Sequence, residues 1–220
     1  MQVSKGEYVK ILVACEESQA VTKELRALGH EAYSCDTEPC SGGHPEWHLQ
    51  QDVAPILKQE WDMIIAFPPC TYLSNAGACR LYPKKGILNE DRYKKGLEAK
   101  EFFMMFYNSK CLMVAIENPV SSTIFKIPKH SQEIQPYQFG HPYTKKTRLW
   151  LKGLPQLIPT EIIEERQPFI PAGTGRKDKT KYGAKNCAHE SKPRSKTFPG
   201  IAKAMAEQWT TPQVTKEATK

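Results

Sequence analysis

Two side chains suited to covalent chemistry follow apolar runs of the sequence. Cys70 follows the run WDMIIAF and two prolines, Pro68 and Pro69, within the stretch AFPPCTYLSN. Because proline fixes its backbone angle φ and donates no hydrogen bond, this pair ends a strand and holds the next residue rigidly. A rigid thiol there suits a nucleophile, although an isolated cysteine is more often a small buried apolar residue. Glu117 ends another apolar run, KCLMVAIENP, where partial burial keeps its proton on the carboxyl group.

Strands alternate with helices along the chain, which predicts an α/β fold with a mainly parallel sheet. The strands are expected at 8–15, 30–36, 61–67, 110–119 and in the segment TRLWLKG. The helices are expected from Ser18 to a stop at Gly29, briefly in QDVAPIL, from 92 to 109 and in the closing segment SKTFPGIAKAMAEQWT. The segments 37–48 and 71–92 are expected to be loops.

Ligands of such sheets bind at the carboxyl ends of the strands. Four predicted strand ends carry reactive or polar groups, in the stretches ACEES, SCD, FPPC and IENP. A thiol and a carboxylic acid at neighbouring strand ends suit chemistry on cytosine. A thiolate that adds to C6 makes C5 nucleophilic, and an acid at N3 stabilises the charge that develops in the ring.

The sequence resembles the DNA (cytosine-5) methyltransferases over most of its length. It looks most like the short members of this family found in bacteriophages. The segments that resemble family motifs stand in the family's order, and they are QDV (51–53), PPC (68–70), IENP (116–119), YTKKTRLW (143–150) and SKTFPGIAKAMAEQW.

The resemblance implies a Rossmann-like methyltransferase fold with helices on both faces, S-adenosylmethionine as methyl donor and DNA as partner. It implies that Cys70 attacks C6 and that Glu117 contacts N3. It also implies that Arg148 lies near the base O2, with Lys146 in the place of the motif's first arginine. Asp36 would bind the ribose hydroxyls and Asp52 the adenine amino group.

One departure concerns the turn after the first strand, where the family usually has a glycine-containing Phe-x-Gly-x-Gly segment. Here the turn reads ACEESQ and contains no glycine, so Glu16 or Glu17 could meet the methionine amino group instead. A second departure is Thr71, which stands where the family has glutamine after the catalytic cysteine. The cofactor-binding residues expected from the sequence are Cys15, Glu16, Ser18, Asp36, Asp52 and Pro68.

The chain carries a net charge of +7 and has a pI of about 9.0. This charge favours a polyanionic partner, although a lysine-rich surface accounts for it equally well. We expect one catalytic domain over residues 1–220 with a short basic substrate-recognition insert at about 160–196; a solvated loop is the plain alternative for that insert. Two other functions stay open: the same chemistry on a free pyrimidine nucleotide or RNA, and a catalytically inactive nucleic-acid-binding module.

The seven cysteines are odd in number and scattered, which favours a reduced intracellular protein. The opening MQVSKGEYVK lacks the apolar centre of a signal peptide, and no apolar stretch approaches the roughly 20 residues of a membrane span. We therefore expect a cytoplasmic protein with no membrane partner. No metal is predicted, because the paired C-x-x-C spacing is missing among the zinc-capable residues Cys35, Cys40, His44, His48, Cys187 and His189.

Overall fold

The computed structural model describes residues 9–78, 80–169 and 196–211. Within these residues the main sheet has seven strands in the order β3-β2-β1-β4-β5-β8-β6. Strand β8 runs antiparallel to both of its neighbours, β5 and β6, while β3, β2, β1, β4 and β5 pair in parallel. The bounds are β1 (Lys10–Ala14), β2 (Glu31–Asp36), β3 (His48–Gln50), β4 (Met63–Ala66), β5 (Met113–Pro119), β6 (Gln132–Ile134) and β8 (Thr147–Lys152).

This strand order, with its single reversed strand, is that of the Rossmann-like methyltransferase fold. The predicted fold class is therefore confirmed. The predicted strands at 8–15, 30–36, 61–67 and 110–119 are present with slightly shorter bounds. The central strands are continuous apolar runs in the sequence, because helices cover both faces of a parallel sheet and bury the side chains on each face.

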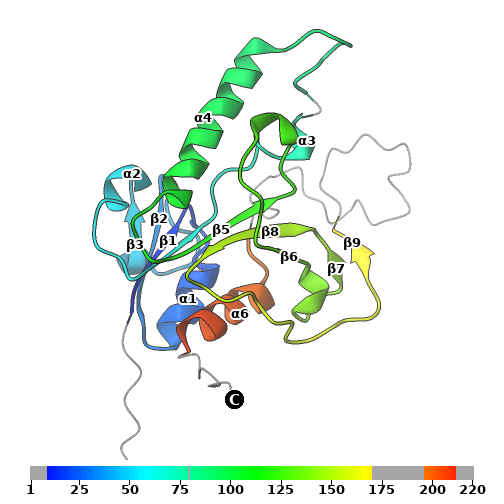
Figure 1. Ribbon diagram of the computed structural model, residues 1–220. Coiled ribbons are helices and arrows are strands. Elements are labelled where there is room, and N and C mark those ends of the chain that lie inside the picture. The colour runs from blue at the N-terminus through cyan, green and yellow to red at the C-terminus, as the bar shows by residue number, and fades with distance from the viewer. Residues whose placement is uncertain (1–8, 79, 170–195, 212–220) are drawn as a thin grey trace, which may run out of the picture.

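Helices cover both faces of the sheet (Figure 1). On one face α1 (Ala20–Ala27) and α6 (Pro199–Thr210) pack against every second side chain of the central strands, such as Ile11 and Val13. On the other face α2 (Val53–Ile56) and α4 (Glu90–Tyr107) cover the alternate side chains, such as Leu12 and Ile64. The sheet therefore separates two apolar layers of the core, one on each face.

Several short elements were not expected from the sequence. The region 71–92, expected as a loop, contains α3 (Asn75–Ala78), and the region 37–48 contains η1 (Pro45–Trp47). The remaining short elements are η2 (Thr123–Phe125), η3 (Pro136–Gln138) and a separate two-stranded parallel pair of β7 (Tyr143–Thr144) with β9 (Gln167–Pro168). These elements of two to four residues lie in segments that show no apolar period.

Gly96 lets α4 pack closely against η2, and this contact gives a first prediction. A Cβ atom at Gly96 would lie 2.1 Å from the ring of Phe125, which is 2% exposed. Overpacking of this kind costs about 1–3 kcal/mol, against a helix-propensity gain of about 1 kcal/mol from glycine to alanine. We therefore expect Gly96→Ala to lower the free energy of unfolding by up to about 2 kcal/mol in urea denaturation.

The matched control is Glu98→Ala, two residues further along α4 and exposed. It should change the unfolding free energy by less than about 0.5 kcal/mol. A stabilised Gly96→Ala protein would show that the ring of Phe125 moves aside without cost.

Candidate functional site

The site lies where the order of the parallel strands reverses, between β1 and β4, since ligands of open α/β sheets bind at that crevice. The turn after β1 begins with Cys15, whose φ is 60°, and its N–H donates to the carbonyl of Cys35 at 2.7 Å. Gln19, which precedes α1, also has a positive φ of 54°. The glycine-free turn therefore adopts the left-handed bends that glycine usually supplies, at a cost of about 1–2 kcal/mol per residue.

Glu16 closes the start of α1 from within the same turn. Its carboxylate accepts hydrogen bonds from the N–H of Val21 at 2.7 Å and from the N–H and hydroxyl of Thr22 at 3.2 and 2.7 Å. Burial raises the pKa of Glu16 to about 7, and these hydrogen bonds and Lys23 oppose that rise. Both carboxylate oxygens of Glu16, a predicted cofactor residue, thus accept hydrogen bonds from α1.

Asp36 and Asp52, the two acids expected to hold the cofactor, converge on the same turn. Asp36 ends β2 and accepts from the N–H of Glu38 at 3.0 Å, while Asp52 caps α2 by accepting from the N–H of Ala54 at 2.8 Å. Burial raises the pKa of the Cys15 thiol, and the charges of Asp36, Cys35 and Asp52 add to that rise. The ends of β1, β2 and β3 therefore form one acidic edge beside a neutral thiol.

Two other predicted cofactor residues have backbone roles. Ser18 is half-buried, and a Cβ atom on Gly42 would lie 2.6 Å from its carbonyl oxygen. The carbonyl oxygen of Pro68 accepts a hydrogen bond from the side chain of Asn118 at 3.2 Å. Of these two residues, Pro68 has its carbonyl group engaged by a side chain, while the carbonyl of Ser18 lies close to Gly42.

Cys70 lies in the loop after β4 and is half-buried. Its carbonyl accepts from the N–H groups of Leu73 and Ser74 at 3.2 and 2.9 Å, which closes a turn into α3. The same loop is bonded to the segment after β5, because the N–H of Asn75 donates to the carbonyl of Val120 at 2.9 Å. The N–H of Ser122 also donates to the carbonyl of Leu73 at 2.7 Å, so the Cys70 loop and the Glu117 strand are held together.

Glu117 faces a small cavity on the α6 side of the sheet. Burial raises the pKa of Glu117, and the charge of Lys145 partly lowers it again. The side chains that line this cavity with Glu117 are Lys145, Thr147, Lys196, Thr197, Phe198, Ile201 and Met205. A protonated carboxyl group in such a site can donate to a ring nitrogen.

Arg148 and Lys146 are held elsewhere in the structure. Both pair with Glu133, Arg148 at 3.4 Å and Lys146 at 2.8 Å. Arg148 lies opposite Asn118 in the β5–β8 ladder, whereas Glu117 lies opposite Leu149. Because neighbouring residues of a strand point to opposite faces, the structure does not bring these two cations to Glu117, and their predicted role stays a prediction.

Lys145 is the functional candidate that the sequence did not reveal. Its ammonium group lies 5.7 Å from the ring centroids of both Phe169 and Phe198, and its charge acts on Glu117. The signal that could have found it is strand parity, since Lys145, Thr147 and Leu149 share one face. That inference needed the register of β8 against β5, which no local pattern contains.

The zinc-capable residues do not form a metal site among the residues that the structure describes, where no group of three or more potential ligands occurs. His48 is bonded to the hydroxyl of Ser34 at 2.8 Å and to the carbonyl of Glu38 at 2.9 Å. Cys187 and His189 lie outside the described residues, as does most of the predicted basic insert. No helix of the described segments is both long and apolar enough to cross a membrane.

Comparison with protein-family models and with curated proteins finds no match for this chain. Among solved structures, the chain is similar to one described as the Entamoeba histolytica methyltransferase EhMeth, with a TM-score of 0.45 and 13% sequence identity. The similarity covers 71% of this chain and 58% of that chain, so this chain spans little more than half of its length. We therefore assign the fold from the strand order and leave the activity to the geometry of the site.

The buried carboxyl group of Glu16 predicts a pH dependence of stability. Its folded pKa of about 7 lies above the ordinary value of 4.5, so the unfolded chain loses this proton first as the pH rises. We expect the free energy of unfolding to fall by about 3 kcal/mol between these two pH values, measured by urea denaturation across pH. The variant Glu16→Gln should lack this decline.

The exposed Glu98→Gln substitution serves as the control and should keep the wild-type pH dependence. Parallel pH curves for the wild type and Glu16→Gln would contradict the assignment of this proton to Glu16.

Proposed function

We propose that this protein is an S-adenosylmethionine-dependent methyltransferase that modifies C5 of cytosine in DNA. The observation that carries the proposal is the joining of two segments at the carboxyl ends of β4 and β5. One segment carries the thiol of Cys70 and the other carries the buried acid Glu117. The strand order supports the proposal, because a sheet of this order opens its ligand crevice at the adjoining ends of β1 and β4.

The acidic edge fits the nucleoside part of S-adenosylmethionine, which supplies an electrophilic methyl group when bound. Within the described residues neither Asp36 nor Asp52 forms an ion pair, so their oxygens can accept from hydroxyl and amino groups. Asp36 would hold the ribose hydroxyls and Asp52 the adenine amino group. Since Glu16 is engaged with α1, we assign the amino group of the methionine part to Glu17, which is half-buried in the same turn.

Cys70 and Glu117 divide the chemistry on the base between them. The thiolate of Cys70 adds to C6, and the new C6–S bond moves the electron pair of the C5–C6 double bond toward C5. Burial raises the pKa of Glu117, which favours the protonated carboxyl group that donates to N3 and offsets the charge that the addition creates in the ring. After C5 has gained the methyl group, it loses its proton to a base, the C6–S bond breaks, and the thiolate is regenerated.

Lys145 is the cation that the proposal assigns to the carbonyl oxygen O2 of the base. It shares the cavity of Glu117 and is held beside two aromatic rings. Arg148 would reach the base only by leaving Glu133. Breaking that partly exposed ion pair costs about 0–1 kcal/mol, but Arg148 also points to the other face of β8 from the side that Glu117 occupies.

DNA is supported as the substrate by exposed cations near the Cys70 loop. The helix α4 and the loop before it extend away from the sheet (Figure 1). Although Glu90 and Asp91 begin the helix, five exposed cations lie on this arm, namely Arg80, Lys84, Lys85, Lys94 and Lys95. Such a surface can follow a phosphate backbone.

The decisive experiment measures transfer of labelled methyl from S-adenosylmethionine to duplex DNA, single-stranded DNA, tRNA and dCMP. We expect label in duplex DNA, and we expect Cys70→Ala to reduce it by about 10³-fold or more, because the covalent route is lost. Label confined to tRNA or dCMP would keep the mechanism and replace the substrate.

The matched control is Cys111→Ala, since Cys111 is also a half-buried free cysteine but lies just before β5, at the opposite end of that strand from Glu117. This variant should transfer methyl at the wild-type rate. A folded wild-type protein that labels none of the four substrates and binds no cofactor would sink the proposal in favour of a nucleic-acid-binding module.

Another prediction concerns Lys145, whose charge lowers the pKa of Glu117. In Lys145→Met that pKa should rise, so the carboxyl group stays protonated to higher pH. We expect the basic limb of the kcat profile to move to higher pH and the maximal kcat to fall, measured by methyl transfer across pH. The exposed Lys203→Gln variant on α6 should leave both the pH profile and the maximal kcat unchanged. If the basic limb of the profile did not move in Lys145→Met, Lys145 would not be the residue that lowers the pKa of Glu117.

A further inference from the structure

A second cavity lies beside α1 and has a volume of about 450 Å³. This volume falls within the range of about 300–1,000 Å³ typical of small-molecule sites. The cavity shares no lining residue with the one at Glu117. Its walls come from the second half of α1, the turn after it and the segment before β3, through Lys23, Arg26, Ala27, Gly29, His30, His44 and Trp47.

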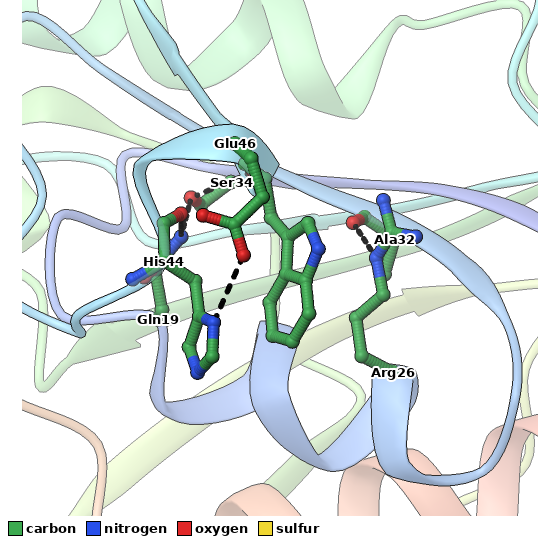
Figure 2. A network of polar contacts seen from close by, with 7 residues as sticks. Gln19, Arg26, Ala32, Ser34, His44 and Glu46 are labelled. Carbon is green, nitrogen blue, oxygen red and sulfur yellow. Dashed lines mark hydrogen bonds and ion pairs between the residues drawn. The ribbon is translucent and has the colours of Figure 1, made fainter.

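The wall before β3 is fixed in place by Gln19, which is fully buried (Figure 2). The amide nitrogen of Gln19 donates to the carbonyl of His44 at 2.7 Å and to the hydroxyl of Ser34 at 3.2 Å. Its amide oxygen accepts from the N–H of His44 at 3.1 Å. The segment is therefore anchored to both α1 and β2, so the cavity is formed before any ligand arrives.

Stacking orders the side chains of this cavity. The rings of His44 and Trp47 are stacked with centroids 3.9 Å apart and planes 9° apart. The guanidinium group of Arg26 lies 5.3 Å from the Trp47 ring and 4.8 Å from the Tyr33 ring, and its Nε donates to the carbonyl of Ala32 at 2.7 Å. Within the described residues the two terminal nitrogens of Arg26 form no hydrogen bond, so a planar fork of donors remains for a ligand.

The charge of this cavity favours an anion. Lys23 and Arg26 are three residues apart on α1, so they lie on the same side of the helix. The nearby carboxylate of Glu46 accepts from His44 at 3.0 Å and also feels the charge of Arg26, so an anionic ligand would compete with Glu46 for Arg26 while Lys23 stays available. The end of α1 presents carbonyl groups that disfavour an anion, and for this reason the anion is expected at Lys23 and Arg26 rather than at Gly29.

His30 adds an unsatisfied polar atom to the same wall. Its Nδ1 is buried and has no hydrogen-bond partner among the residues that the structure describes. Buried polar atoms without a partner are uncommon in folded proteins, and a bound ligand or water is one way to satisfy them.

We propose that this cavity binds the phosphate group of a nucleotide, with Lys23 and Arg26 as its cationic ligands. The base then stacks on the outer face of the His44 imidazole, whose side chain is 40% exposed. The phosphate can come from a free nucleotide or from a nucleic-acid strand. The site does not depend on methyl transfer, since none of its residues takes part in the proposed reaction.

The test is calorimetric titration of the full chain with thymidine 5′-monophosphate, because neither the proposed cofactor site nor the proposed cytosine site recognises thymine. We expect saturable binding that Lys23→Gln and Arg26→Gln each weaken by about tenfold, through loss of a charge-assisted hydrogen bond. Thymidine and inorganic phosphate should each bind more weakly than the nucleotide. If oligothymidylate binds more tightly than the monophosphate and is weakened equally by both variants, the phosphate comes from a nucleic-acid strand. If the monophosphate binds more tightly, the phosphate comes from a free nucleotide.

The matched control is Lys203→Gln, an exposed lysine of α6, which should bind as the wild type does. Glu117→Gln should also bind normally, whatever its methyl transfer. The proposal would be overturned if neither thymidine 5′-monophosphate nor oligothymidylate showed saturable binding. Unchanged binding of these probes to Lys23→Gln would also overturn it. Loss of binding in Glu117→Gln would overturn it too, since the probe would then occupy the cavity at Glu117.

Discussion

The hydrogen bond from the amide nitrogen of Asn118 to the carbonyl oxygen of Pro68, at 3.2 Å, joins the two segments on which the proposed chemistry depends. Pro68 and Pro69 have no N–H group, so the ladder between β4 and β5 cannot continue past them. The side chain of Asn118, which is fully buried and adjoins Glu117, links the strand ends where the ladder stops. Further along, the backbone hydrogen bonds from Asn75 to Val120 and from Ser122 to Leu73 join the two segments again.

Two glutamates, Glu117 on β5 and Glu133 on β6, each interact with different cations from the segment at β8. Glu117 faces α6 and shares its cavity with Lys145, while Glu133 on β6 collects Lys146 and Arg148. Cations of one short segment, Lys145 just before β8 and Arg148 within it, thus serve different acids. The buried acid keeps a raised pKa, and Glu133 keeps a lowered one because Lys146 and Arg148 bind it.

The sequence was sufficient to predict those parts of the fold that repeat a pattern over enough residues. The buried runs of β1, β4 and β5 and the amphipathic segments of α1, α4 and α6 were found at close to their observed bounds. The strand-end rule placed Cys15 and Asp36 at one edge of the sheet, and the family resemblance added Asp52; in the structure the charges of both acids act on the Cys15 thiol. The short strands β6, β7 and β9 carry too few residues for a period to appear.

The sequence predicted the position of a site residue only where that position is set by the end of the strand on which the residue lies. Lys145 was missed because its partner is set by the pairing of Glu117 with Leu149 across more than 30 residues of sequence, which a local motif does not contain. Glu16 was assigned to the cofactor because its type and place suit that role. The alternative, a carboxylate that caps its own helix, depends on how the turn bends back toward Val21 and Thr22.

That bend has a consequence for the motions of the crevice edge. Cys15 and Gln19 are held in left-handed conformations that residues with a Cβ atom avoid, and the hydrogen bonds of Glu16 and Gln19 offset this strain. Loss of either network would release both strained residues together, because they flank the same turn. We therefore expect the turn, the start of α1 and the segment at His44 to open together rather than residue by residue, because the same hydrogen bonds hold all three.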